Sequence, residues 1–198
     1  MISSWLARKI LQLLGWRIEG QLPSGVRKGV VVFAPHTSNW DAFYGLLILK
    51  AIRIPYRFAI KKEALFFPVG LVLKRLGAVP VARKKHGPQP SHAGTTPKVV
   101  ALLRQTEDIF LVIAPEGTRK YAPKWRSGFY HIAQQAQVPI LTVYIDYSRK
   151  LAGWGPAYHP PHKDFEKLVK ELRTFYSTKQ GRYPVAGVQD TAIQRVAK

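Results

Sequence analysis

Residues 29–34 read GVVVFA, an apolar segment in which four β-branched or aromatic residues follow one another. Such a segment is typical of a buried strand. Residues 108–114 (DIFLVIA) and 139–147 (PILTVYIDY) have the same character and predict two further buried strands. Strands that are separated by helical segments favour an α/β sheet, so the segments between these three strands decide the fold class.

Helical patterns lie between and around the strands. Helices are predicted at residues 40–50, 98–105, 129–137 and 164–176, with a kinked helix or two short helices over 62–76. Weaker strands are predicted at residues 57–61 and 77–83, and Pro80 predicts that the second of these is an edge strand or a bulged strand. Residues 86–97 and 153–161 are predicted loops, the second with a short strand near 157–159. We therefore predict a single α/β domain over residues 1–198, with a mixed, largely parallel central sheet layered with helices and a loosely held polar tail at 177–198.

The N-terminal residues 1–18 predict an amphipathic helix. Arg8 and Lys9 interrupt the apolar residues, which excludes a signal peptide. No uncharged apolar segment of the chain reaches the length needed to cross a bilayer. The segment 1–20 therefore either packs on its own domain or lies in a membrane interface with its apolar face in lipid. The residues that recur at helical spacing are Ile2, Trp5, Leu6, Ile10, Leu13 and Leu14.

The charge of the chain points to an anionic partner. The 198 residues include 31 Lys and Arg but only 11 Asp and Glu, which gives a formal net charge of +20. Nucleic acid, an anionic membrane surface and a phosphorylated substrate all match this charge. Few aromatic residues are interleaved with the basic clusters, which argues against nucleic acid. The absence of cysteine excludes disulfides, thiolate nucleophiles and Cys-ligated zinc.

His36 and Asp41 lie where the first buried strand leads into a helix. The turn between the two elements can bring these side chains together, so that the carboxylate orients the imidazole as a general base. Alternatively, Asp41 is a helix-capping residue beside a structural histidine, because an acidic residue in the first helical turn is favoured by the helix dipole. A zinc site is disfavoured because no second histidine stands at ligand spacing.

Residues 116–119 (EGTR) follow the second buried strand. A glycine turn beside a guanidinium suits phosphate binding, because backbone donors approach closely and arginine binds phosphate through two hydrogen bonds. Arg83 and its basic neighbours could add to the same site. The alternatives are a solvated basic turn and a local ion pair between Glu116 and Arg119. Since parallel strands end at one edge of a sheet, the polar clusters after these strands are expected to meet there.

Four motifs in this order resemble the glycerolipid acyltransferase family, which includes 1-acyl-glycerol-3-phosphate acyltransferases. They are the His-x4-Asp motif at 36–41, a loose match to Gly-x-Ile-x-Ile-x-Arg at 77–83, Pro-Glu-Gly-Thr-Arg at 115–119, and a Val-Pro-Ile motif at 138–140. Their order and spacing agree with the family over residues 29–145. Pro35 before the histidine and Val81-Ala82 before the arginine depart from its usual pattern.

The resemblance implies an enzyme that moves a fatty acyl group from a thioester to a lysophospholipid hydroxyl. In such an enzyme His36 is the general base, Asp41 is its orienting partner, and no acyl-enzyme, metal or bound cofactor is required. The donor is acyl-CoA or an acylated carrier protein. The residues that the resemblance assigns to the acceptor phosphate are Arg83, Glu116, Gly117, Thr118 and Arg119.

The acceptor stays open at this point. The first choice is 1-acyl-glycerol-3-phosphate, which would give phosphatidic acid, and another lysolipid or a non-phosphorylated hydroxyl is the alternative. The basic surface and the N-terminal helix predict a peripheral membrane protein at the cytoplasmic face. Rival functions are a non-catalytic protein that binds anionic lipid or nucleic acid, and a thioester hydrolase that uses the same His36 and Asp41.

Overall fold

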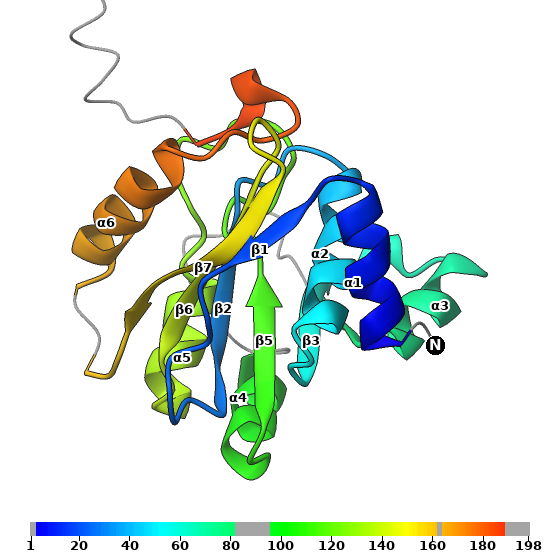
Figure 1. Ribbon diagram of the computed structural model, residues 1–198. Helices are drawn as coiled ribbons and strands as arrows, with labels where there is room; N and C mark the ends of the chain where they lie inside the picture. Colours follow the sequence, from blue (N-terminus) through cyan, green and yellow to red (C-terminus); the bar gives the residue numbers. More distant parts are fainter. Residues whose placement is uncertain (1–2, 82–95, 162–163, 189–198) are drawn as a thin grey trace, which may run out of the picture.

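The computed structural model describes residues 3–81, 96–161 and 164–188 (Figure 1). The elements in chain order are α1 (Ser4–Leu13), β1 (Arg17–Glu19), β2 (Lys28–Ala34), α2 (Trp40–Ala51), β3 (Tyr56–Lys61), η1 (Lys62–Ala64), α3 (Val69–Arg75), β4 (Ala78–Val81), α4 (Thr96–Gln105), β5 (Ile109–Ile113), α5 (Gly128–Ala136), β6 (Ile140–Asp146), β7 (Leu151–Tyr158), α6 (Phe165–Ser177) and η2 (Pro184–Ala186).

The described strands form one sheet in the order β1-β7-β6-β2-β5-β3-β4. Strands β6, β2, β5, β3 and β4 are parallel to one another, whereas β7 is antiparallel to β6 and parallel to β1. The predicted mixed, largely parallel α/β sheet is therefore confirmed. Strand β4, which contains Pro80, lies at an edge as predicted, because proline cannot donate to a neighbouring strand.

Helices cover both faces of the sheet, and the alternation of side chains along β2 explains why this strand is apolar throughout. Val30 and Val32 pack in one core with residues of α4, α5 and α6. Val31 and Phe33 pack in the other core with residues of α1 and α2. Figure 1 shows β2 in the middle of these layers. A strand that is buried on both faces needs apolar side chains at successive positions.

Two expectations about the strands were wrong. The helix predicted over residues 1–18 ends at Leu13, and Arg17–Glu19 forms β1. Gly15 adopts a left-handed φ of +79°, which ends the helix and redirects the chain toward the sheet.

The second error concerns residues 153–161, whose glycines and prolines predict a loop. Most of residues 153–161 belong to β7, an eight-residue strand. Its glycines are needed because neighbouring groups lie close: a Cβ built at Gly155 would lie 2.3 Å from the Phe175 ring, and one at Gly153 would lie 2.7 Å from the Glu19 carbonyl oxygen. Composition alone therefore hides this strand.

Two packing expectations also differ from the structure. The segment 40–50 is apolar on nearly all sides, which predicts a buried helix, but Trp40 and Phe43 in α2 are nearly half exposed. The tail from residue 177 was predicted to be loosely held, but the Tyr147 N–H donates to the Gln180 carbonyl at 2.9 Å and Val188 is buried. Residues 189–198 lie outside the described residues, as do 86–95 of the predicted loop, whose last two residues begin α4.

Candidate active site

The ends of three neighbouring parallel strands bring polar side chains together. His36 lies two residues beyond β2, Glu116 three residues beyond β5, and Tyr147 directly after β6. Strand β2 pairs with β5 on one side and with β6 on the other. The expected meeting of the clusters after the strands is thus observed for residues 36–41 and 116–119. Arg83 lies outside the described residues, so its position relative to this edge is not part of the structure.

His36 and Asp41 lie side by side across the turn of residues 36–41, which we name the catalytic turn after the role proposed for it below. The His36 Nδ1 atom is 3.3 Å from Asp41 Oδ2. Asp41 is fully buried, whereas a quarter of the His36 side-chain surface is exposed. Because Nδ1 itself is buried, the exposed part belongs to the rest of the ring. The imidazole thus faces the carboxylate with Nδ1 and can present Nε2 to a substrate.

The contact between His36 and Asp41 is close but oblique. Among the described residues, Nδ1 has no partner in hydrogen-bond geometry. No other polar group therefore competes with Asp41 for this nitrogen in the described part of the chain. Hydrogen bonds at catalytic bases are often long or poorly aligned before the substrate binds, so this geometry does not argue against a base at His36.

Three hydrogen bonds fix the Asp41 carboxylate. Its Oδ2 atom accepts the backbone N–H groups of Thr37 at 2.6 Å and Ser38 at 2.7 Å. Its Oδ1 atom accepts the hydroxyl of Tyr147 at 2.7 Å. Asp41 therefore stabilises the backbone of the turn and also faces His36, which combines the two interpretations that the spacing left open. Burial and the hydrogen bond to Asp41 raise the pKa of Tyr147 above its ordinary value, so the phenol remains a donor.

Glu116 holds the backbone of the histidine. Its side chain is buried, and Oε2 accepts the His36 N–H at 2.8 Å. No ion pair joins Glu116 to Arg119 in the described part of the chain, where the only acid-base pairs within 4.0 Å involve other residues. Burial raises the pKa of Glu116 from 4.5 to about 7. Glu116 thus supports the position of His36.

The pKa of Glu116 predicts how stability depends on pH. A carboxyl whose pKa is higher in the folded than in the unfolded state stabilises the fold below about 4.5 and loses that contribution as pH rises through about 7. Between pH 5 and pH 8, the free energy of unfolding should fall by roughly 2 to 3 kcal/mol more in the wild type than in Glu116→Gln. Urea unfolding at both pH values measures this difference, and parallel pH profiles for the two proteins would contradict it.

Arg119 lies beside the catalytic turn. Its guanidinium donates from Nη1 to the Oδ1 atom of Asn39, the residue before α2. Arg119 is exposed, and Gly117 adopts a φ of +61°, which forms the tight turn before it. Thr118 accepts the Lys120 N–H at 3.3 Å and so stabilises the same turn. The exposed guanidinium thus lies beside Asn39 of the turn, and a group of this kind can bind an anion through paired hydrogen bonds.

Sequence reasoning missed two parts of this edge. Tyr147 follows the end of β6 just as His36 and Glu116 follow β2 and β5, so the same rule could have found it. Residues 180–183 also lie against this edge, through hydrogen bonds to Tyr147 and Thr37, and no pattern in the sequence predicted these contacts. Within residues 3–81, 96–161 and 164–188, no group of three His, Asp or Glu side chains could hold a metal ion.

Comparisons with known proteins indicate the family of this chain. A family model described as Acyltransferase matches residues 16–146, which is more than half of the chain and includes the turn and residues 115–119. A segment of 74 residues is 38% identical to an uncharacterized acyltransferase of Schizosaccharomyces pombe. That match covers 33% of this chain and 24% of the relative, so the chain aligns with about a quarter of that protein's length.

Proposed function

The chain belongs to the acyltransferase family, and on that premise we propose that it transfers a fatty acyl group from a thioester to a lysophospholipid hydroxyl. The first acceptor to consider is 1-acyl-glycerol-3-phosphate, which would give phosphatidic acid. The observation that carries the proposal is the pairing of a partly exposed His36 with the fully buried Asp41. A histidine held in this way is suited to act as a general base toward an alcohol.

In the proposed reaction, His36 removes the proton of the acceptor hydroxyl while the oxygen attacks the thioester carbonyl. Asp41 orients the imidazole and stabilises the imidazolium that forms. The new C–O ester bond forms as the C–S bond breaks, and the proton passes from His36 to the departing thiolate. The acyl group moves directly from donor to acceptor, so no acyl-enzyme is required, and the chain contains no cysteine that could form a thioester with it.

Arg119 supports a phosphorylated acceptor. Its guanidinium contacts Asn39, three residues from His36 in the catalytic turn, and has no carboxylate within ion-pair distance among the described residues. Glu116, Gly117 and Thr118 shape the strand end that carries it. An acceptor phosphate bound by Arg119 would lie near the base, as required for a hydroxyl on the same small headgroup.

An acceptor panel tests this proposal. The purified chain is offered radiolabelled palmitoyl-CoA and palmitoyl carrier protein, each with lysophosphatidic acid, lysophosphatidylcholine, lysophosphatidylglycerol and monoacylglycerol. Transfer to lysophosphatidic acid should exceed transfer to monoacylglycerol, because only the former presents a phosphate monoester to Arg119. Equal transfer to both would show that the acceptor phosphate is not recognised. Absence of transfer to every acceptor would refute the proposed function.

We also propose that the protein acts at the cytoplasmic face of a membrane, where its lipid acceptor resides. Helix α1 packs on the core that it shares with α2 through Ala7, Ile10 and Leu11, yet other apolar side chains of this helix and its end are exposed: Trp5, Leu6, Leu13 and the adjoining Leu14. Further exposed apolar side chains lie in and before α3: Phe66, Phe67, Val69, Leu71 and Val72. Together with the charge of +20, these suit binding to anionic lipid. In the described residues, no helix is both long and apolar enough to cross a bilayer.

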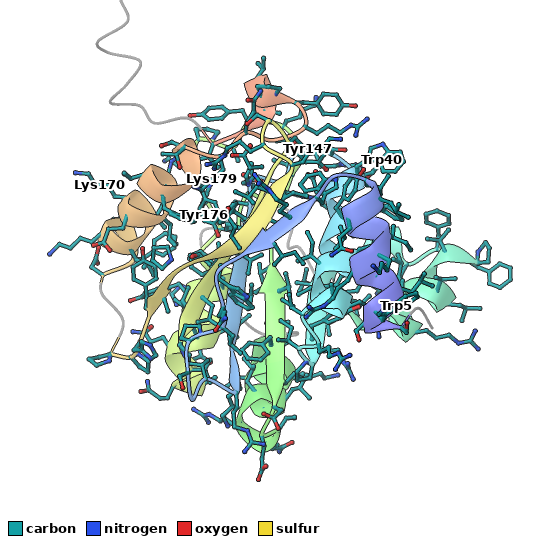
Figure 2. The ribbon with its side chains drawn as sticks, in the orientation of Figure 1. Trp5, Trp40, Tyr147, Lys170, Tyr176 and Lys179 are labelled. Carbon is teal, nitrogen blue, oxygen red and sulfur yellow. The ribbon has the colours of Figure 1, made fainter. Side chains whose placement is uncertain are left out.

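The exposed residues of α1 can be changed with little effect on the fold. Trp5 is 64% exposed and Leu13 is 86% exposed, and Figure 2 shows Trp5 on α1, away from α6. Replacing both by Ser should weaken binding to vesicles containing phosphatidylglycerol by about tenfold or more, since two large apolar side chains no longer enter lipid. Sedimentation with vesicles measures this. Val185→Ser removes another side chain that is 83% exposed and serves as the control; equal binding of both variants would contradict the proposal.

A further inference from the structure

The segment that follows α6 packs on the catalytic turn. The Tyr147 N–H donates to the Gln180 carbonyl at 2.9 Å, and the Tyr183 N–H donates to Thr37 Oγ1 at 3.3 Å. Between them, Gly181 lies directly against Thr37, where an added Cβ would be 2.6 Å from the Thr37 methyl carbon. Residues 180–183 are therefore held against the turn, and only a glycine allows this close approach.

This packing places the guanidinium of Arg182 above the site. Its central carbon lies 5.3 Å from the centre of the Trp40 ring and 6.0 Å from the centre of the Tyr147 ring. Trp40 and Tyr147 lie near each other at one end of the molecule (Figure 2). Trp40 precedes Asp41 in the chain and Tyr147 is hydrogen-bonded to it. A positive charge thus lies over the two aromatic residues that flank the buried carboxylate.

The hydrogen-bonding capacity of Arg182 is unused in the described part of the chain. The side chain is exposed, and no described residue accepts a hydrogen bond from it or forms an ion pair with it. Other arginines of the chain are neutralised, such as Arg27 by Asp108 and Arg149 by Asp146. The aromatic rings hold the cation in place while its N–H donors stay available to a ligand.

Arg119 and Arg182 approach the same turn from different parts of the chain. Arg119 contacts Asn39 and Arg182 lies over Trp40, the next residue. An anion that contacted both guanidinium groups would be attracted by both charges. Phosphate esters match such a site, because arginine binds phosphate oxygens through paired, charge-assisted hydrogen bonds.

We propose that Arg182 binds a substrate phosphate ester at the catalytic turn, as a second anion-binding group beside Arg119. The inference rests on the proposed function and specifies its substrate contacts. The phosphate could come from the acceptor headgroup or from the phosphopantetheine arm of the donor, since both carry the same chemistry to the same reaction.

Binding measurements with two unreactive probes separate these sources. Isothermal titration calorimetry with sn-glycerol 3-phosphate reports on the acceptor headgroup, and titration with coenzyme A reports on the donor. Arg182→Gln should weaken binding of at least one probe by about tenfold, a size expected for a lost charge-assisted hydrogen bond. Arg182→Lys should be intermediate because it retains the charge but not the planar pair of donors. Lys170→Gln removes one exposed charge from α6 and should bind like the wild type.

Each outcome of this experiment decides the inference. Weaker binding of glycerol 3-phosphate assigns Arg182 to the acceptor, and weaker binding of coenzyme A assigns it to the donor. Wild-type affinity of Arg182→Gln for both probes, or failure of the wild type to bind either, overturns the proposal. If Arg182→Gln is unfolded by circular dichroism, Arg182→Lys alone decides. Neither probe reacts, so a protein that binds them through Arg182 yet transfers no acyl group would refute the proposed function and not this inference.

Discussion

Replacing His36 by Ala should lower kcat/KM for acyl transfer by roughly 10²- to 10⁴-fold, the usual contribution of a general base. Without the imidazole, no group between the acceptor and Asp41 can accept the hydroxyl proton. A quarter of the His36 side chain is exposed, and its Nδ1 makes no hydrogen bond among the described residues, so the fold should tolerate the change. Initial rates with labelled thioester measure the loss.

The matched control is His159→Ala, which removes an exposed histidine after β7. It should keep wild-type activity. Thermal unfolding of both variants confirms that the comparison is between folded proteins. Wild-type activity in His36→Ala would remove this residue from the mechanism.

Replacing Asp41 by Asn should lower kcat by roughly 10²- to 10⁴-fold with little change in KM, because the neutral amide cannot stabilise the imidazolium. The amide oxygen can still accept from Thr37 and Ser38, and its NH₂ group can donate to the Tyr147 hydroxyl, so the turn should survive. Tyr147→Phe keeps the charge and loses one hydrogen bond, so its loss should be only about fivefold to tenfold. Equal activities of Asp41→Asn and the wild type would contradict the orienting role.

The fold could be predicted largely from residues whose surroundings are encoded locally. The apolar segment at residues 29–34 predicted a buried strand, and β2 is that strand. Pro80 predicted an edge or bulged strand because proline lacks a donor, and β4 is at the edge. Strand β1 was not predicted because a strand of three residues is too short to show an alternating pattern. Strand β7 was not predicted because its glycines, which are typical of a loop, are required here by close contacts with other elements.

The site could be predicted only where residues follow strand ends. His36, Asp41 and Glu116 were identified in this way, and the structure brings them together; their catalytic roles stay predictions. Spacing could not show that Glu116 would bond to the His36 backbone instead of pairing with Arg119, because it does not define side-chain direction. The position of Arg182 could not be predicted from the sequence, because its contact with Trp40 joins segments that are far apart in the chain.

The claim that the protein transfers the acyl group to an acceptor hydroxyl, and not to water, is tested most directly by following both products of one reaction. Labelled palmitoyl thioester is incubated with the wild-type protein, with and without lysophosphatidic acid, and free palmitate and phosphatidic acid are quantified together. We predict that thioester loss requires the acceptor and that the label appears in phosphatidic acid. Release of free palmitate at the same rate without acceptor would show that water is the acceptor and would contradict the account.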